Sequence, residues 1–144
     1  MSTVLYTAHA TNTKGGRQGH VESDDGILKY DLATPGAPNA PAGSTTPEQL
    51  FAAAYASCFG SAIEAMGRRA GLAVEAAKIH AHVSLHKAEV KGFFVSTVLD
   101  IEIPGLTQAQ IEDLIREGHK ICPFSKLTRG ESEVTLKANG QTVG

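Results

Sequence analysis

Short segments with strand-like patterning recur along the chain. They are Val4–Thr11, His20–Ser23, Ile27–Leu32, Lys78–Lys87, Phe93–Ile103 and Glu133–Ala138. The second and third segments flank "DDG", and an Asp-Gly pair suits the positive backbone angles of a tight hairpin turn. The fourth and fifth each have one apolar and one polar face, so both are expected in a sheet with one wet side.

The start of a long helix is marked by the sequence after a Pro-rich segment. Residues Ala33–Thr45 contain three prolines and two glycines and are expected as a long loop. Thr46 and Gln49 then have the spacing of a capping box, with Pro47 at the first helical position. The predicted helix begins there and ends near Gly71.

A second, shorter helix is predicted from another capping box. Thr107 and Gln110 supply its first turn, and its apolar stripe extends to Cys122 before Pro123 stops the helix. The order of elements is then three strands, a helix, two strands, a helix and a strand. This order predicts one α+β domain over residues 1–144 with a largely antiparallel sheet.

The long helix is apolar on nearly every side. Two adjacent stripes run along it: Leu50, Ala54, Cys58, Ala62 and Met66, and beside them Phe51, Tyr55, Phe59 and Ile63. A helix that is hydrophobic all round must be buried all round, and one small sheet covers one face. We therefore expect a homodimer in which a second subunit covers the other face.

Composition excludes several classes of function. The 13 Lys and Arg against 15 Asp and Glu give a net charge of -2, and no run of like charges indicates nucleic-acid or membrane binding. The N-terminus lacks the basic and apolar segments of a signal peptide, and the longest uncharged stretch is short for a bilayer span, so a cytoplasmic protein is expected. In that reducing compartment, two cysteines distant in sequence are poor candidates for a structural disulfide or a zinc site.

Cys58 is the main candidate for chemistry, although a helix cysteine is more often a small buried hydrophobe. Three features favour reactivity: Cys122 ends the other helix on its buried stripe, Arg17 lies in the Gly-rich turn "KGGRQG", and Glu48 begins the long helix. Taken separately, Arg17 is readily explained as a solvated turn residue and Glu48 as a favourable first-turn acid.

A thiol in this position needs a cation to ionise. Burial lowers the thiolate fraction, and Cys58 lies roughly 16 Å past the helix start, beyond the reach of the helix dipole. An arginine at about 4 Å in an effective dielectric of about 20 contributes roughly 4 kcal/mol, which is about three pKa units. We take Arg17 as the candidate, and Glu48 as a carboxylate able to orient it through a bidentate pair.

Four stretches of the sequence together carry a family resemblance. They are "GGRQGHVESDDGIL", "TPEQLFAAAYASCFGSAI", "IPGLTQAQIEDLIREGHKICPFS" and "TRGESEVTL". With them the chain resembles, over essentially its whole length, the Ohr/OsmC family of thiol peroxidases, and the organic hydroperoxide resistance branch within it. After Cys122 it departs from the common family pattern at Phe124, Lys126 and Leu127, and Lys126 adds a positive charge near that thiol.

The resemblance implies a function and a site. It makes Cys58 the peroxidatic cysteine and Cys122 the resolving one, with Arg17 and Glu48 holding the thiolate and the peroxide. The reaction implied is reduction of alkyl or lipid hydroperoxides through a Cys58 sulfenic acid and a Cys58–Cys122 disulfide. The implied fold is an intertwined α+β homodimer with its central helices packed together. The implied reductant is dihydrolipoamide or a lipoylated protein, and no metal, flavin or haem is implied.

Other functions and sites remain open at this point. The chain also fits the OsmC subgroup of the family, or a noncatalytic apolar-ligand or redox-sensing module. His80, His82 and His86 share one strand face, and a solvated polar face explains them better than zinc. His119, one turn before Cys122, is better explained as a cation at a helix C-terminus than as a base.

Overall fold

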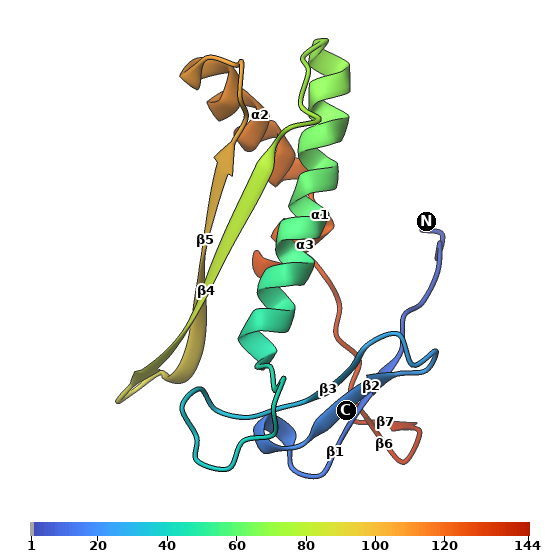
Figure 1. The fold of residues 1–144 in the computed structure, drawn as a ribbon. Coiled ribbons are helices and arrows are strands. Elements are labelled where there is room, and N and C mark those ends of the chain that lie inside the picture. The colour runs from blue at the N-terminus through green and yellow to red at the C-terminus, as the bar shows by residue number, and fades with distance from the viewer. Residues whose placement is uncertain (1) are drawn as a thin grey trace. The chain divides into compact units, whose positions relative to one another are not determined.

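The computed structural model describes residues 2–144. The chain divides after Phe51 into two compact units, and Figure 1 labels the elements of each. The first unit contains a three-stranded antiparallel sheet with β2 in the centre. Its strands are β1 (Ala10–Thr13), β2 (His20–Ser23) and β3 (Lys29–Asp31), with a short 3-10 helix, η1 (Gly16–Gln18), between the first two. The predicted hairpin between β2 and β3 is confirmed, and Gly26 adopts the positive φ of 73° that its turn requires.

The Pro-rich loop is present and its two ends are joined. Leu32 and Thr45 form an isolated parallel bridge, the Ala33 N–H donates to the Thr45 carbonyl, and the Thr45 N–H donates to the Asp31 carbonyl. The loop therefore leaves and returns at one place beside β3, directly before the long helix.

Helix α1 (Pro47–Ala70) begins and ends as predicted, although its capping box is incomplete. The Thr46 Oγ1 accepts the Gln49 N–H at 3.0 Å, which satisfies one free donor of the first turn. The Gln49 side chain instead accepts from the Thr45 hydroxyl at 2.7 Å. Gly71 ends the helix with a φ of 69°, a conformation that suits glycine.

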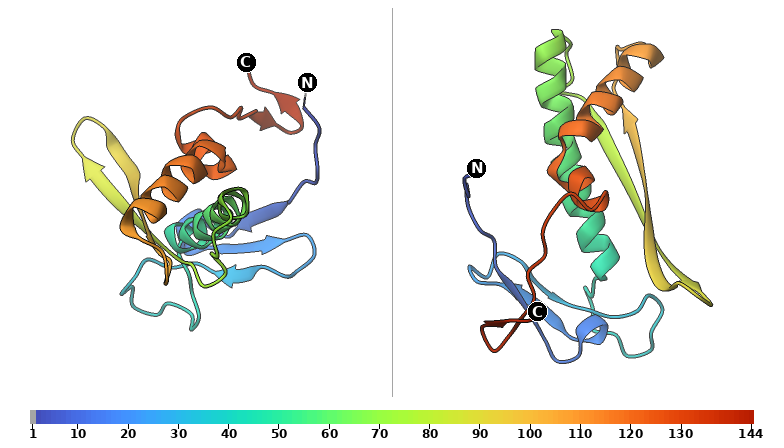
Figure 2. Two further views of the ribbon diagram at one scale, coloured as in Figure 1. Left: turned by 90° about the horizontal axis from the view of Figure 1, so that it is seen from above. Right: turned by 180° about the vertical axis from the view of Figure 1, so that it is seen from behind.

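The second unit holds the rest of α1, a long hairpin and two further helices. The hairpin is formed by β4 (Lys78–Ala88) and β5 (Gly92–Glu102), and the helices are α2 (Gln108–Ile121) and α3 (Pro123–Thr128). Helix α2 runs alongside α1, and the hairpin lies beside both (Figures 1 and 2). At the N-terminus of α2, the predicted capping box of Thr107 and Gln110 is complete. The mixed α+β class with antiparallel sheets is confirmed.

The core of the second unit is centred on one side of α1. The largest buried residues on that helix are Tyr55, Phe59, Ile63 and Met66. The other elements contribute Ile101 from β5, Ile103 from the segment after β5, and Leu114 from α2. Helix α1 is long and apolar enough to cross a membrane, but the core helix of a soluble protein can have the same length and composition. A third of its most apolar window is buried within this chain.

Three of the predicted elements need correction. The first strand is Ala10–Thr13 rather than Val4–Thr11, because β2 ends at Ser23, the partner of Ala10, and leaves the preceding exposed residues without a strand partner in the described chain. The strand predicted over Glu133–Ala138 is limited to β6 (Lys137–Ala138), which pairs with β7 (Gln141–Thr142). Asn139 and Gly140, both at positive φ, turn the chain there.

The third correction concerns the end of α2. Pro123 does stop α2, but it also starts α3, in which it occupies the first position. Proline is favoured there because its missing N–H would have no helical partner in any case. Cys122 is therefore the residue shared by two helices, at the C-terminal end of α2 and the N-terminal end of α3.

We expect Gly67→Ala to destabilise the second unit. A Cβ at this buried position of α1 would lie 2.6 Å from the Val74 Cγ2 and 3.2 Å from the Val74 Cβ. Val74 is β-branched and stiff about χ1, so a side-chain rotation does not readily relieve the contact. Overpacking of this kind lowers the free energy of unfolding by about 1–3 kcal/mol. Urea titration of the wild type and the variant measures this difference. Gly118→Ala is the matched control, since its Cβ would meet neighbours at ordinary contact distance; equal stability loss in both variants would contradict the packing explanation.

Candidate functional site

The two cysteines lie against each other in the second unit. The Cys122 Sγ is 3.6 Å from the Cys58 Sγ, and both are free thiols. Cys122 is fully buried, whereas Cys58, in the middle of α1, is partly exposed. A disulfide bond has an S–S length of about 2.05 Å, so the sulfurs need to approach by roughly 1.5 Å to form one.

Close packing of α2 on α1 explains this approach. Gly118 is buried in α2, and a Cβ at this position would lie 3.5–3.6 Å from the side chains of Ile63 and Phe59. The Cys122 N–H donates to the Gly118 carbonyl at 2.9 Å and so continues the hydrogen bonding of that helix. A small residue one turn before Cys122 thus lets its helix end approach the middle of α1.

The surroundings of Cys58 oppose its ionisation. Burial is the largest cause that raises the pKa of its thiol, and the neighbouring Cys122 raises it further. The backbone N–H of Phe124, in the first turn of α3, donates toward Cys58 and acts in the opposite direction. The raised pKa agrees with the expectation from the sequence that burial lowers the thiolate fraction of Cys58.

Arg17 lies in the first unit, in a turn that depends on glycine. Lys14, Gly15 and Gly16 all have positive φ, and a Cβ on Gly19 would lie 2.1 Å from the Thr13 carbonyl oxygen. The Asn12 side chain spans the turn: its amide donates to the carbonyls of Gly16 and His20, and its Oδ1 accepts the Gly16 N–H at 3.1 Å. The backbone that carries Arg17 is therefore held from within.

Arg17 and Glu48 form a bidentate pair. The two guanidinium nitrogens Nη1 and Nη2 donate to Oε1 and Oε2 at 2.7 and 2.6 Å. This hydrogen bonding lowers the pKa of the Glu48 carboxyl, and that of the Arg17 guanidinium is raised. Because the carboxyl pKa is lowered in the folded state, the pair stabilises the fold above the ordinary glutamate pKa of about 4.3, and this contribution is lost as the pH falls through the lowered value.

The structure therefore brings the four predicted site residues together as two pairs, Cys58 with Cys122 and Arg17 with Glu48. Residues that sequence reasoning did not single out support each pair. Asn12 holds the Arg17 turn, and the buried Ser125, hydrogen-bonded to Tyr55, lies one turn beyond Cys122. The sequence feature that could have identified Ser125 is a hydroxyl residue among the apolar positions of the segment after Cys122.

The histidines take two different positions. His80 lies 3.4 Å from Glu102 and His86 lies 2.7 Å from Ser96, both on the exposed face of the hairpin. His119 instead has its Nδ1 2.8 Å from the Ser125 Oγ and is tied into the cysteine-bearing helices. Among residues 2–144, no group of three or more His, Cys, Asp or Glu side chains is arranged to hold a metal ion.

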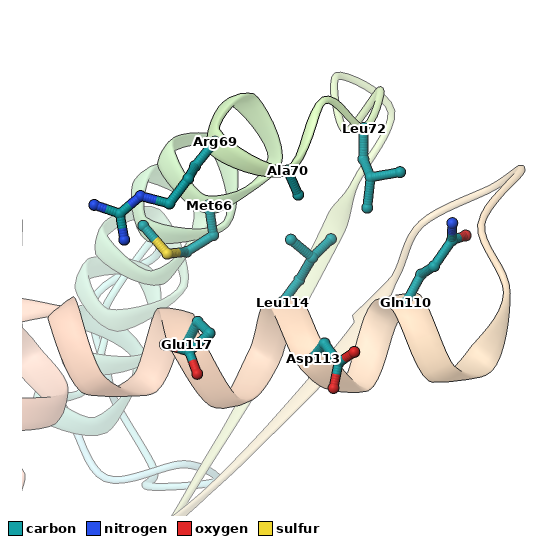
Figure 3. Close-up of a pocket in the computed structure, with 8 residues that line it drawn as sticks. All are labelled: Met66, Arg69, Ala70, Leu72, Gln110, Asp113, Leu114 and Glu117. Atoms are coloured by element: carbon teal, nitrogen blue, oxygen red, sulfur yellow. The ribbon is translucent and has the colours of Figure 1, made fainter.

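A pocket of about 330 Å³ lies between α1 and α2, toward the C-terminal end of α1 (Figure 3). It is lined by Met66, Arg69, Ala70, Leu72, Gln110, Asp113, Leu114 and Glu117. Its two carboxylates are paired on their own helix, Asp113 with Arg116 at 2.6 Å and Glu117 with Lys120 at 2.8 Å. None of the four predicted site residues lines it, so we do not assign it to the cysteine site.

Comparison with known proteins covers most of the chain. A model of the OsmC-like protein family matches residues 40–137. The organic hydroperoxide resistance protein OhrB of Bacillus subtilis is 40% identical over 135 residues, which cover 93% of this chain and 98% of that protein. An organic hydroperoxide resistance protein of Xanthomonas axonopodis pv. citri is 41% identical over 139 residues, covering 92% and 94% of the two chains.

Solved structures agree with these matches. The crystal structure of Bacillus subtilis OhrB superposes with a TM-score of 0.81 at 41% identity, covering 88% of this chain and 93% of that one. An organic hydroperoxide resistance protein from Legionella pneumophila gives a TM-score of 0.79 at 42% identity, over 89% and 93% of the chains. The chain therefore belongs to the Ohr/OsmC family, among relatives named organic hydroperoxide resistance proteins.

Proposed function

We propose that this protein is a thiol peroxidase that reduces alkyl or lipid hydroperoxides to alcohols. The observation that carries the proposal is the 3.6 Å separation of the Cys58 and Cys122 sulfurs in a largely buried setting. Two thiols at this distance can form a disulfide with little rearrangement. A cysteine that served only as a small core residue would not need a second thiol beside it. The names of the relatives, organic hydroperoxide resistance proteins, agree with a peroxide-detoxifying role.

The reaction assigns a separate step to each cysteine. The Cys58 thiolate attacks the outer peroxide oxygen, the O–O bond breaks, and the alcohol leaves with a proton while Cys58 becomes a sulfenic acid. The Cys122 sulfur then bonds to the Cys58 sulfur, and the S–O bond breaks to release water. A dihydrolipoyl dithiol, free or on a lipoylated protein, reduces the disulfide through a mixed disulfide and restores both thiols.

Arg17 is the proposed activating group. Burial raises the pKa of Cys58, so the first step needs a nearby positive charge. The Arg17 guanidinium is permanently charged, and Glu48 already fixes its plane through two short hydrogen bonds. In the active arrangement we place it beside the thiolate and the peroxide.

The apolar setting favours organic substrates over hydrogen peroxide. The neighbours of the cysteines include the buried ring of Phe59, next to Cys58 in α1, and the half-buried ring of Phe124, two residues after Cys122. Each methylene of a substrate that is buried there contributes about 0.8 kcal/mol to binding. Hydrogen peroxide has no such group, so its reduction gains nothing from this environment. We place the activity in the cytoplasm, where reduced thiols persist.

The two cysteines are expected to fail in different ways when replaced. Cys58→Ser abolishes consumption of tert-butyl hydroperoxide with dihydrolipoamide as reductant, because no sulfenic acid forms. Cys122→Ser permits one turnover and then stalls with an oxidised Cys58. A steady-state assay with hydrogen peroxide and with thioredoxin in parallel tests substrate and reductant. If both variants bind the hydroperoxide and the wild type shows no turnover, the protein is a carrier or sensor instead.

Replacing Arg17 should change how the rate depends on pH. In Arg17→Ala the pKa of Cys58 rises, so the rate of its reaction with hydroperoxide falls at neutral pH and recovers about tenfold per pH unit as the solution is made alkaline. Glu48→Gln keeps the guanidinium but weakens its orientation, so an intermediate loss is expected. Stopped-flow rates between pH 5 and about 9 measure both. Identical pH profiles for wild type and Arg17→Ala would exclude Arg17 as the activating cation.

We also propose that the protein is a homodimer, from an apolar face of the β4–β5 hairpin. Ile79 and Ile101 pair on the face that packs in the core, and Leu85, Val95 and Phe93 continue the same face toward the hairpin turn. These three are 45%, 48% and 70% exposed in the single chain. The hairpin turn extends away from α2 (Figure 1), so within the second unit that helix leaves this end uncovered.

Val95→Lys tests the dimer. In analytical ultracentrifugation we expect the wild type to have the mass of two 15.1 kDa chains. The variant should shift toward the mass of one chain, because a charge would replace apolar surface in the interface. Val98→Lys is the matched control, since Val98 is 59% exposed on the opposite face of the same strand. A wild type that sediments as a monomer at micromolar concentration would contradict the proposal.

A further inference from the structure

One buried hydroxyl joins the three helices around the cysteines. Ser125 is completely buried in the first turn of α3. Its Oγ lies 2.7 Å from the phenolic oxygen of Tyr55 on α1 and 2.8 Å from the Nδ1 of His119 on α2. A serine hydroxyl has one proton and two lone pairs, so it can satisfy both neighbours at once.

Each of the three residues lies one helical turn from a cysteine. Tyr55 precedes Cys58 by three residues on the same side of α1, and His119 precedes Cys122 by three. Ser125 follows Cys122 by the same number and is adjacent to Phe124, whose N–H donates toward Cys58. The hydrogen bonds of Ser125 therefore connect the backbone segments that carry both sulfurs.

Arg129 holds His119 in this arrangement. Its Nη1 donates to the His119 carbonyl at 2.9 Å and lies 3.3 Å from the His119 Nε2. A guanidinium only donates, so in a hydrogen bond between these two groups Nε2 is the acceptor, and Nδ1 is then the nitrogen that donates to the Ser125 Oγ. Glu131 holds Arg129 in turn, through Nε at 3.0 Å.

His119 is thus hydrogen-bonded on two sides, to Ser125 through Nδ1 and to Arg129 through its ring and its carbonyl. These contacts hold the ring in one orientation at the end of α2.

We propose that Tyr55, Ser125 and His119 form a hydroxyl clamp that positions Cys122 for its attack on the Cys58 sulfenic acid. The inference rests on the proposed peroxidase function and deepens it. The three are positioning residues, since none receives the thiol proton or the departing oxygen. In the step they assist, the Cys122 sulfur bonds to the Cys58 sulfur, the S–O bond of the sulfenic acid breaks, and the hydroxyl leaves as water with the Cys122 proton.

The clamp matters because a second reaction competes for the sulfenic acid. Another hydroperoxide molecule oxidises it to a sulfinic acid, which a dithiol does not reduce. Which product forms depends on the ratio of the two rates. Misplacing reacting atoms by about 1 Å can slow an intramolecular step by about a hundredfold, so a loosened clamp shifts the outcome toward sulfinic acid.

Tyr55→Phe is the first test, since it removes one oxygen and keeps the ring against Phe59 and Phe124. We expect disulfide formation after a single equivalent of tert-butyl hydroperoxide to slow at least tenfold, while sulfenic acid formation changes by about twofold or less. Intact-protein mass spectrometry should then detect sulfinic Cys58 at about a tenfold lower peroxide concentration than in the wild type.

Two His119 variants separate positioning from general stability. His119→Ala removes the donor to Ser125 and should behave like Tyr55→Phe. His119→Asn retains an N–H donor at a similar place and should recover much of the rate. Val74→Ala is the control for stability, because Val74 is buried against Gly67 and takes no part in the clamp. Equal sulfinic acid formation in Val74→Ala at matched stability would overturn the proposal.

A second readout keeps the clamp distinct from the peroxidase reaction. Equilibration with oxidised dithiothreitol measures the effective concentration of the Cys58 and Cys122 thiols without any hydroperoxide. We expect this value to fall about tenfold or more in Tyr55→Phe and His119→Ala, even if the wild type shows no turnover of organic peroxides. Unchanged values in both variants would overturn the clamp and leave the proposed function standing.

Discussion

The close approach of α2 to the middle of α1 is the constraint on which the second unit depends. At Gly118 a single methyl group would just fit against Phe59 and Ile63, whereas a larger side chain would hold the helices apart. The same contact determines where α2 ends, and its terminal residue is Cys122 with its sulfur 3.6 Å from that of Cys58. The packing of apolar side chains between α1 and α2 therefore also determines the relative position of the two thiols.

That packing also creates an electrostatic conflict. The burial that brings the sulfurs together raises the pKa of the Cys58 thiol. Within the second unit the Phe124 N–H offsets this in part, and a full charge has to come from elsewhere. Arg17, the cation that we propose for this role, is oriented by two hydrogen bonds to Glu48, although its side chain remains 48% exposed.

Sequence reasoning succeeded where local chemistry decides structure. Thr107 with Gln110, and Thr46 with Pro47, identified helix starts because capping depends on neighbouring residues alone. It failed at Val4–Thr11 and Glu133–Ala138, where strand length depends on a partner elsewhere in the chain. The pairing of Arg17 with Glu48 was anticipated from their chemistry. The Ser125 contacts were not, since they join residues on three helices.

The Pro-rich loop between β3 and α1 is tied at its base. Hydrogen bonds of Thr45 to Ala33 and Asp31 close it directly before Thr46, the residue that caps α1. Inside the loop, Thr34 accepts from the side chain of Gln18 at 2.6 Å and so contributes to the turn that carries Arg17, the partner of Glu48. The residues from Pro35 onward lie beyond that contact. The segment can therefore gain, lose or exchange residues during evolution, or accept a spectroscopic label, without transmitting the change into the helix that bears Cys58.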